Sequence, residues 1–289
     1  MKHMYIDFHT HTRRSDGMLD PQALVDRARE AGIGILAITD HDHTEDLSAL
    51  RQRNPDIRLI QGAEISCIHT AADGKETDIH MVALGIDPEN EKLKAVLAKN
   101  KPDRRPYVEA ILKRTAECGM ALGTYEELAA ANPDTLHLGR MQIAKRMTVL
   151  GYVTGVDEAF DVYLGAFGQR RAFVPNPLRY VPMEDAAEAI LAAGGVPVLA
   201  HLYYYQMSEK KGRELVRDFS ALVGDRGAME VYYGRYDDTQ RKALAALADE
   251  FGLMHSAASD FHGHAENETL HHKFTQESCR KLLDRLTKD

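Results

Sequence analysis

Near its start the chain reads Met4-Tyr5-Ile6-Asp7-Phe8-His9-Thr10-His11, a short apolar run that ends in two histidines. A nearly continuous apolar run of this length is typical of a strand that is buried on both faces of a sheet. Residues two apart in an extended strand project to the same side, so His9 and His11 can offer their imidazole nitrogens to one metal ion. The stretch therefore predicts a buried strand with metal ligands at its end, although a lone His-x-His pair is also common on protein surfaces.

Other short apolar runs follow the same pattern along the chain. They are Ile35–Thr39, Leu59–Gly62, Met81–Gly85, Val196–Ala200, Ala228–Tyr232 and Met254–Ala258. Helical patterns separate several of them: one helix follows the capping residue Asp20, with Pro21 at its first position, and ends at Gly32. Further helices are expected at residues 183–193 and 239–251. This alternation predicts an α/β fold, either a β/α barrel or another fold with a parallel sheet.

The middle of the chain has a different pattern, because residues 88–173 are almost entirely helical in character. The expected helices are Glu91–Lys99, Pro106–Cys118, Tyr125–Ala131, Met141–Leu150 and Val156–Tyr163. We therefore expect two domains: residues 1–87 and 174–289 form the β/α domain, and residues 88–173 form an α-helical insertion. Such an insertion either covers the site at the strand ends or merely adds packing to the fold.

The composition limits the class of protein. The chain has 289 residues, 44% of them hydrophobic, which is enough for a large core. The net charge of −8, with no basic stripe, argues against a stable nucleic-acid partner, although bound divalent cations could still attract an anionic substrate. Three widely spaced cysteines suit a reducing compartment. Because no signal peptide or long apolar run is evident, we expect a cytoplasmic protein without a membrane segment.

Polar residues that can bind metal ions collect beside the apolar runs. Thr39-Asp40-His41-Asp42-His43 ends the second run, Glu64 follows the third, and Asp260-Phe261-His262 follows the last. Taken singly, each histidine could be a hydrogen-bonded core residue, and each carboxylate could cap a helix. In a β/α barrel, however, the C-terminal ends of all strands meet at one face. Seven residues would converge there: His9, His11, His41, Glu64, His201, Asp260 and His262.

Together these segments resemble the polymerase and histidinol phosphatase (PHP) family, a branch near the amidohydrolases. The matching residues are His9-Thr10-His11, Asp16-Gly17, Thr39-Asp40-His41-Asp42, Gly62-Ala63-Glu64, His80, Ala200-His201 and Asp260-Phe261-His262-Gly263. They span residues 5–86 and 181–264, and their order, spacing and surrounding apolar runs all agree. The resemblance implies a distorted β/α barrel of about seven strands with a centre of three divalent metal ions. His80 begins its apolar run instead of ending it, so its place in the site depends on the resemblance alone.

The resemblance also implies which residues hold each metal ion. One ion would be held by His9, His11, Glu64 and Asp260; a second by His80, His201 and a bridging Glu64; and a third by Asp16, His41 and His262. Asp40 would orient a ligand histidine. A set of nitrogen and oxygen ligands without thiolates suits Mn²⁺, Fe²⁺ or Zn²⁺.

The expected activity is that of a metal-dependent phosphoesterase, because bound cations activate water and stabilise charge on phosphoryl oxygens. The family resemblance implies a small phosphorylated substrate, nucleotide-like in kind: a nucleoside bisphosphate, a nucleoside monophosphate or a cyclic phosphate. Gly139-Arg140 resembles the start of a Gly-Arg-Pro-His segment in the small-molecule phosphoesterases of the family, but Met141-Gln142 replaces its proline and histidine. Arg140, with Arg104 and Arg171, is expected to contact the substrate phosphate.

Two other functions stay open at this point. One is an amidohydrolase that cleaves C–N bonds, which one or two metal ions would favour over three. The other is a non-catalytic domain that binds metal or nucleotide for regulation. Tyr203, Tyr204 and Tyr205, directly after His201 and Leu202, could line the pocket or form a partly buried rim. The sequence indicates no oligomeric state.

Overall fold

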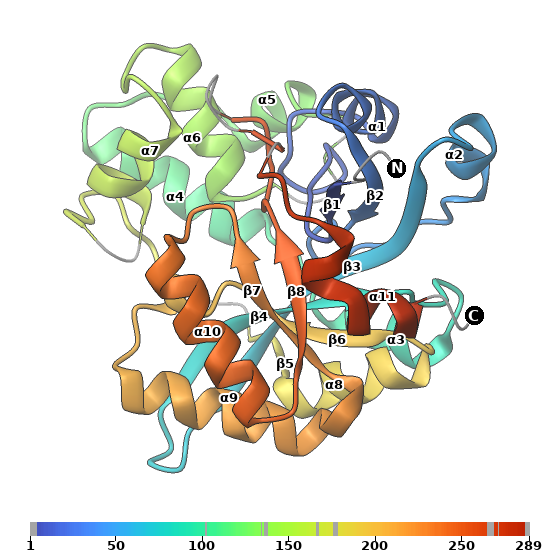
Figure 1. Cartoon of the computed structure of the whole chain (residues 1–289). Helices are drawn as coiled ribbons and strands as arrows, with labels where there is room; N and C mark the ends of the chain where they lie inside the picture. Colours follow the sequence, from blue (N-terminus) through green and yellow to red (C-terminus); the bar gives the residue numbers. More distant parts are fainter. Residues whose placement is uncertain are drawn as a thin grey trace.

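The computed structural model describes residues 5–101, 103–133, 135, 138–165, 168–175, 179–264, 269–270 and 272–286. In this part of the chain an eight-stranded sheet is surrounded by helices (Figure 1), which confirms the α/β prediction. The strands are β1 (Tyr5–Asp7), β2 (Ile33–Ile38), β3 (Arg58–Thr70), β4 (Glu76–Leu84), β5 (Val181–Pro182), β6 (Val196–Leu199), β7 (Ala228–Tyr233) and β8 (Met254–Ala258). Each predicted apolar run overlaps one of these strands, while Met4 lies outside the described residues.

The strands follow the order β1-β2-β3-β4-β6-β7-β8, with β5 beside β3. β4 is antiparallel to both of its neighbours, β3 and β6, which the strand–helix alternation of the sequence does not predict. The reason is the short turn at residues 71–75, because a parallel crossover needs a dozen or more residues. Asp73-Gly74 marks this turn in the sequence, and Gly74 has the positive φ of 78° that such turns require.

The first and last strands of this order also meet. The Phe8 N–H donates to the Ala257 carbonyl at 2.9 Å, and the Asp260 N–H donates to the His9 carbonyl at 3.0 Å. These bonds bring the ends of β1 and β8 side by side, although the two strands are 250 residues apart in sequence. The closure of the sheet into a barrel stays a prediction.

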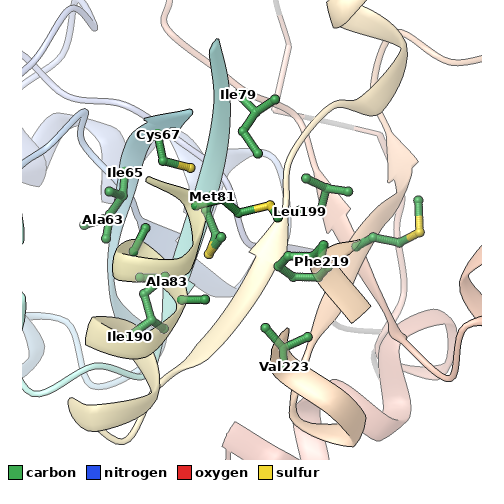
Figure 2. Packing of buried hydrophobic residues seen from close by; sticks show 14 of the residues in the cluster. Ala63, Ile65, Cys67, Ile79, Met81, Ala83, Ile190, Leu199, Phe219 and Val223 are labelled. Atoms are coloured by element: carbon green, nitrogen blue, oxygen red, sulfur yellow. The ribbon is translucent and has the colours of Figure 1, made fainter. Parts of the chain in front are cut away.

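Helices pack against the sheet through apolar faces. They are α1 (Pro21–Glu30), α2 (Ser48–Arg53), α3 (Glu91–Lys99), α8 (Met183–Ala192), α9 (Glu209–Val223), α10 (Asp238–Glu250) and α11 (Arg280–Leu286). Figure 2 shows Ile190 of α8 and Phe219 of α9 in one buried cluster with strand residues such as Met81. α1 begins as expected, because the Asp20 carboxylate accepts a hydrogen bond from the Ala23 N–H at 2.8 Å.

The remaining helices form a second group: α4 (Arg105–Glu117), α5 (Tyr125–Ala130), α6 (Arg140–Val149), α7 (Val156–Glu158) and the π-helix η1 (Ala159–Leu164). They share a hydrophobic cluster whose buried members all fall between residues 107 and 172. In Figure 1 they gather on the side toward which β7 and β8 point. By contrast, Leu93 and Leu97 of α3 are buried in the cluster around the sheet. The domain division at residues 88 and 173 stays a prediction.

Short 3₁₀ helices complete the described elements: η2 (Leu202–Tyr205), η3 (Gly224–Arg226) and η4 (Gln276–Cys279). None of the helices in the described ranges combines the length and the apolar character needed to cross a bilayer.

Candidate metal centre

The predicted ligands come together at one end of the sheet. His9, His201 and Asp260 each lie two residues beyond the last residue of their strand, namely β1, β6 and β8. Glu64 lies inside the long strand β3, where the isolated bridge between His41 and Glu64 brings the end of β2 beside it. His80 fits because β4 is antiparallel: its backbone carbonyl accepts from the Ala200 N–H at 3.2 Å, directly before His201. The strand direction therefore explains why His80 precedes its apolar run.

His9, His11 and Asp260 form the first group of potential ligand atoms. The Nε2 atoms of His9 and His11 lie 3.0 Å apart. Oδ1 of Asp260 lies 3.5 Å from His9 Nε2 and 3.3 Å from His11 Nε2. Oε2 of Glu64 is also close, at 3.2 Å and 3.3 Å from the same two nitrogens. These four side chains are the set expected to hold the first ion.

Glu64 lies at the centre of the second group. Its Oε1 is 2.8 Å from His80 Nδ1 and 3.0 Å from His201 Nε2. Its Oε2 is 3.0 Å from His41 Nδ1. The carboxylate therefore contacts imidazoles on both sides, as a bridging ligand would. His41, Glu64 and His80 form this second group of potential ligand atoms, and His201 contacts the same carboxylate.

Asp16 organises the third group, which contains His11, His41 and His262 besides the carboxylate. Its Oδ1 lies 3.2 Å from His262 Nε2, and its Oδ2 lies 3.7 Å from His41 Nε2. The Nδ1–H of His262 donates to the Asp260 carbonyl at 2.8 Å, which directs Nε2 toward Asp16. His11 is thus shared between the first and third groups.

The charges in this cluster depend strongly on one another. Burial disfavours the charged form of Glu64, but the imidazoles of His41, His80 and His9 outweigh it and hold its pKa well below the usual range. Burial likewise opposes protonation of His41, yet Glu64 and Asp16 raise its pKa to about 10. Asp16 and Asp260 raise the pKa of His262 to about 9 against the same opposing burial. The buried carboxylates are therefore stable in their charged form because several positive charges lie nearby.

Divalent cations would supply that charge, and the geometry fits them. Oε2 of Glu64 is buried and makes no hydrogen bond of acceptable geometry with any described residue, although nitrogens of three histidines lie 3.0–3.3 Å away. Such lone pairs, which point to a common centre and make no proper hydrogen bond there, suit the ligand atoms of a metal ion. Six imidazoles and three carboxylates, without a thiolate, form a donor set for a borderline divalent cation.

Strained backbone supports two of these side chains. His201 has a φ of 26° and Asp260 a φ of 55°, in the left-handed region that residues other than glycine seldom adopt. Such strain persists where the surrounding structure determines it, and it is concentrated at functional sites. Tyr233 holds Asp260 by donating its hydroxyl to Oδ2 at 2.7 Å.

Glu230, inside β7, is a buried contact of the site that we do not predict from the sequence. The Nδ1–H of His9 donates to its Oε1 at 2.6 Å, and the His201 backbone N–H donates to its Oε2 at 2.7 Å. An acidic residue inside the apolar run Ala228–Tyr232 was the available signal, because a buried charge is costly unless it is paired. Its partners, however, are distant in sequence.

That Asp40 orients a ligand histidine stays a prediction, and Ser15 Oγ, which lies 3.5 Å from His11 Nδ1, is the group between them. The Asp40 carboxylate accepts from the Thr12 N–H at 2.8 Å and the Thr12 hydroxyl at 2.7 Å. It also accepts from the Ser15 hydroxyl at 2.6 Å. Asp40 therefore fixes the loop between His11 and Asp16.

Helix α6 contacts this same loop from the other side. Lys145 Nζ donates to the Asp16 carbonyl at 2.8 Å, and Gln142 Nε2 donates to the Ser15 carbonyl at 3.4 Å. The helical segment therefore supports the third group of potential ligands through backbone oxygens.

The structure does not bring the three predicted arginines to one place. Arg104 directly precedes α4, its side chain is 21% exposed, and Nη2 lies 3.9 Å from Asp42 Oδ2. Arg140 is half-buried at the start of α6, with its guanidinium 6.0 Å from the centre of the Phe160 ring. Arg171 is exposed, and its carbonyl accepts from Cys118 Sγ at the opposite end of α4. A helix of that length separates it from Arg104 by about 20 Å.

This fold and this site define a PHP protein: the PHP domain matches residues 7–288, and the chain belongs to that family. It is 34% identical to a 5′-3′ exoribonuclease of Haemophilus influenzae over 258 residues, which cover 89% of each chain. It is 31% identical to a 3′,5′-nucleoside bisphosphate phosphatase of Chromobacterium violaceum over 263 residues, covering 90% of this chain and 88% of that one. A solved structure described as an amidohydrolase from Chromobacterium violaceum, with bound sulfate and no metal, has a TM-score of 0.81 and 29% identity, covering 97% of this chain and 96% of that one.

Proposed function

We propose that the protein is a metal-dependent phosphoesterase that hydrolyses a phosphate ester of a small nucleotide-like substrate. The observation that carries the proposal is the convergence of His9, His11 and Asp260 with Glu64 and further histidines into three adjoining groups of potential ligands. Curated relatives named as a nucleoside bisphosphate phosphatase and an exoribonuclease support the substrate class, because both names specify phosphate esters of nucleotides.

We assign the ions to the ligands that the family resemblance implies. His9, His11, Glu64 and Asp260 would hold the first ion; Glu64, His80 and His201 the second; and Asp16, His41 and His262 the third. Mn²⁺, Fe²⁺ and Zn²⁺ all suit these ligands. Bound cations would supply Lewis-acid activation of water and of the phosphoryl oxygens.

The protein's own residues position the site and the substrate. Glu230 fixes His9 in the tautomer whose Nε2 is free to act as a ligand. Arg104 and Arg140 would bind phosphate oxygens beside the cations. Arg104 suits this role because its Nε is buried without a hydrogen-bond partner among the described residues. An arginine presents a planar fork of donors that matches phosphate oxygens. Arg171 is the weaker candidate because of its position.

A nucleoside 3′,5′-bisphosphate is our first choice of substrate, with one phosphate at the cations and the other at the arginines. The 5′ end of an RNA is the second candidate, because the exoribonuclease relative is slightly more similar at 34% than the phosphatase at 31%. The net charge of −8 favours the small substrate, since long RNA is retained chiefly by phosphate neutralisation. The neighbour described as an amidohydrolase keeps C–N cleavage as the alternative reaction.

The test is a substrate panel assayed with each of Mn²⁺, Fe²⁺ and Zn²⁺. The panel contains adenosine 3′,5′-bisphosphate, AMP, a cyclic phosphate, a short 5′-phosphorylated RNA and a set of amides. We expect release of inorganic phosphate or mononucleotide, and elemental analysis is expected to give about three cations per chain, as a phosphoesterase of this class uses. Amide cleavage without phosphate release, with fewer bound cations, would instead identify an amidohydrolase. Metal binding without any hydrolysis would identify a regulatory domain.

The arginines are tested by single alanine variants. Arg140→Ala and Arg104→Ala are expected to raise KM for the bisphosphate about tenfold or more while leaving the bound metal unchanged. Arg171→Ala is the matched control and is expected to leave KM unchanged. A wild-type KM in all three variants would contradict the phosphate-binding role of Arg104 and Arg140.

A further inference from the structure

Three consecutive tyrosines follow His201 in η2, and two of them are held by specific contacts. The Tyr205 hydroxyl donates to the Ala200 carbonyl at 3.0 Å and accepts from the His80 N–H at 2.9 Å. The Tyr203 N–H donates to the Tyr236 hydroxyl at 3.0 Å, and the two rings contact edge to face with their centres 5.2 Å apart. The turn is therefore firmly attached to the strands that carry the candidate ligands.

Tyr204, between them, faces outward beside the metal centre. Its ring is 5.3 Å from the His201 imidazole at an interplanar angle of 67°, and its side chain remains 63% exposed. The left-handed residues His201 and Gln206 bracket the turn, with φ values of 26° and 49°, so the backbone sets the direction of the ring. An exposed tyrosine is common, but one fixed against a candidate metal ligand is placed for contact with whatever binds there.

The charges around Tyr204 show what such a molecule would meet. Arg140 and Arg235 are close enough to the Tyr204 hydroxyl to interact with it electrostatically, and so are Asp260 and Glu64 of the metal centre. The ring thus lies near the groups proposed to hold phosphates. A nucleotide whose phosphates occupied the cations and Arg140 would have its nucleoside next to this ring.

We propose that Tyr204 is a stacking platform for the nucleobase of the substrate. This inference rests on the proposed function and adds a base subsite to it. Every base has a π-face, so stacking on an aromatic ring distinguishes nucleotides from sugar phosphates without distinguishing one base from another. Tyr204 is accordingly a specificity residue that acts through its ring and not through its hydroxyl.

The experiment compares Tyr204→Ala, Tyr204→Phe and the control Tyr152→Ala, an exposed tyrosine that follows α6. Substrates are adenosine and uridine 3′,5′-bisphosphate, with ribose 5-phosphate and glycerol phosphate as phosphate esters without a base. Tyr204→Ala is expected to raise KM for both bisphosphates about 5- to 100-fold with kcat nearly unchanged, as loss of one base stack predicts. Tyr204→Phe and Tyr152→Ala should keep the wild-type KM, and the substrates without a base should be hydrolysed equally by all variants.

Four outcomes would contradict the stacking proposal or the function on which it rests. If Tyr204→Phe is as impaired as Tyr204→Ala, the hydroxyl acts and the stacking proposal is wrong. If the alanine variant loses activity equally on glycerol phosphate, Tyr204 acts through His201, and the proposal is again wrong. An unchanged KM for the bisphosphates overturns the base subsite while leaving phosphoesterase activity intact. Absence of hydrolysis of every phosphate ester by the wild-type protein overturns the proposed function itself.

Discussion

The Nδ1–H of His9 donates to Oε1 of Glu230 at 2.6 Å, and both side chains are fully buried below the candidate metal centre. The second oxygen of Glu230 accepts from the His201 backbone N–H at 2.7 Å. One carboxylate therefore orients an imidazole from β1 and the strained residue at the end of β6. Carboxylates in this position fix the tautomer of a ligand histidine and raise its basicity.

Glu230→Gln is expected to weaken metal binding about 10- to 100-fold, the usual effect of removing such a partner. The amide keeps the shape of the carboxylate, but its NH₂ group would face either the His9 or the His201 N–H donor. Calorimetric titration of the metal-free protein with Mn²⁺ measures the affinity. Glu250→Gln, which changes an exposed glutamate paired with Arg213, is the control. Equal affinities in the two variants would contradict the orienting role.

Lys145→Met should selectively release the cation nearest Asp16. The ammonium donates to the carbonyls of Asp16 and Gly17, at 2.8 Å and 3.4 Å, and so holds the loop from the side of α6. Methionine keeps the apolar stem but cannot donate, so this loop should loosen while Glu64 and its histidines stay in place. Elemental analysis after gel filtration is expected to show about one cation fewer than the predicted three. The reason is that the affinity of a metal site depends on the geometry of its ligands.

Lys92→Met, at an exposed lysine paired with Glu188, supplies the control for Lys145→Met. It should retain the wild-type metal content. Unchanged metal content in Lys145→Met together with a raised KM would mean that the lysine contacts the substrate instead of supporting the loop.

The strand ends could be predicted from the sequence because local pattern encodes them. Apolar runs followed at once by His9, His201 or Asp260 specify both a buried strand and the face at which it ends. The start of α1 was likewise local, since Asp20 and Pro21 are adjacent to the helix they begin. What these features share is that each is decided by neighbours in the chain.

The direction of β4 and the role of Glu230 were not predicted from the sequence. Asp73-Gly74 signalled a tight turn, but repeated strand–helix alternation elsewhere favoured a parallel sheet. Glu230 contacts His9 across 221 residues, and nothing near it in the sequence names that partner. Arg171 lies apart from Arg104 for a similar reason: its position follows from how its segment packs against the far end of α4, which the helical pattern alone does not determine.

Asn100→Ala is expected to destabilise the protein by about 2–4 kcal/mol, because it leaves several buried polar groups without partners. Its side-chain N–H groups donate to Asp42 Oδ1 at 2.8 Å and to the Ser66 carbonyl at 2.6 Å, and its oxygen accepts from the Val181 N–H at 3.1 Å. Urea unfolding in the presence of a chelator measures the change without a contribution from metal ions.

Asn90→Ala is the control for Asn100→Ala, because Asn90 caps α3 at a half-buried position. Loss of such a cap costs about 1 kcal/mol. If the two variants were equally stable, the buried network at Asn100 would contribute no more than an ordinary helix cap.

Addition of Mn²⁺ to the metal-free protein should raise the free energy of unfolding, because the cations bind the folded ligand groups and not the unfolded chain. Each site contributes about 2.7 kcal/mol when the free ion is at one hundred times its Kd. Thermal unfolding with and without the ion would therefore differ by at least about 5 °C in Tm for a chain of this size.

Glu64→Gln is the matched variant. Oε1 and Oε2 of Glu64 contact histidines of two groups, so the loss of its charge weakens two metal sites at once. The Mn²⁺-dependent rise in Tm should shrink markedly in that variant. An undiminished rise would mean that Glu64 holds none of the Mn²⁺ that stabilises the protein.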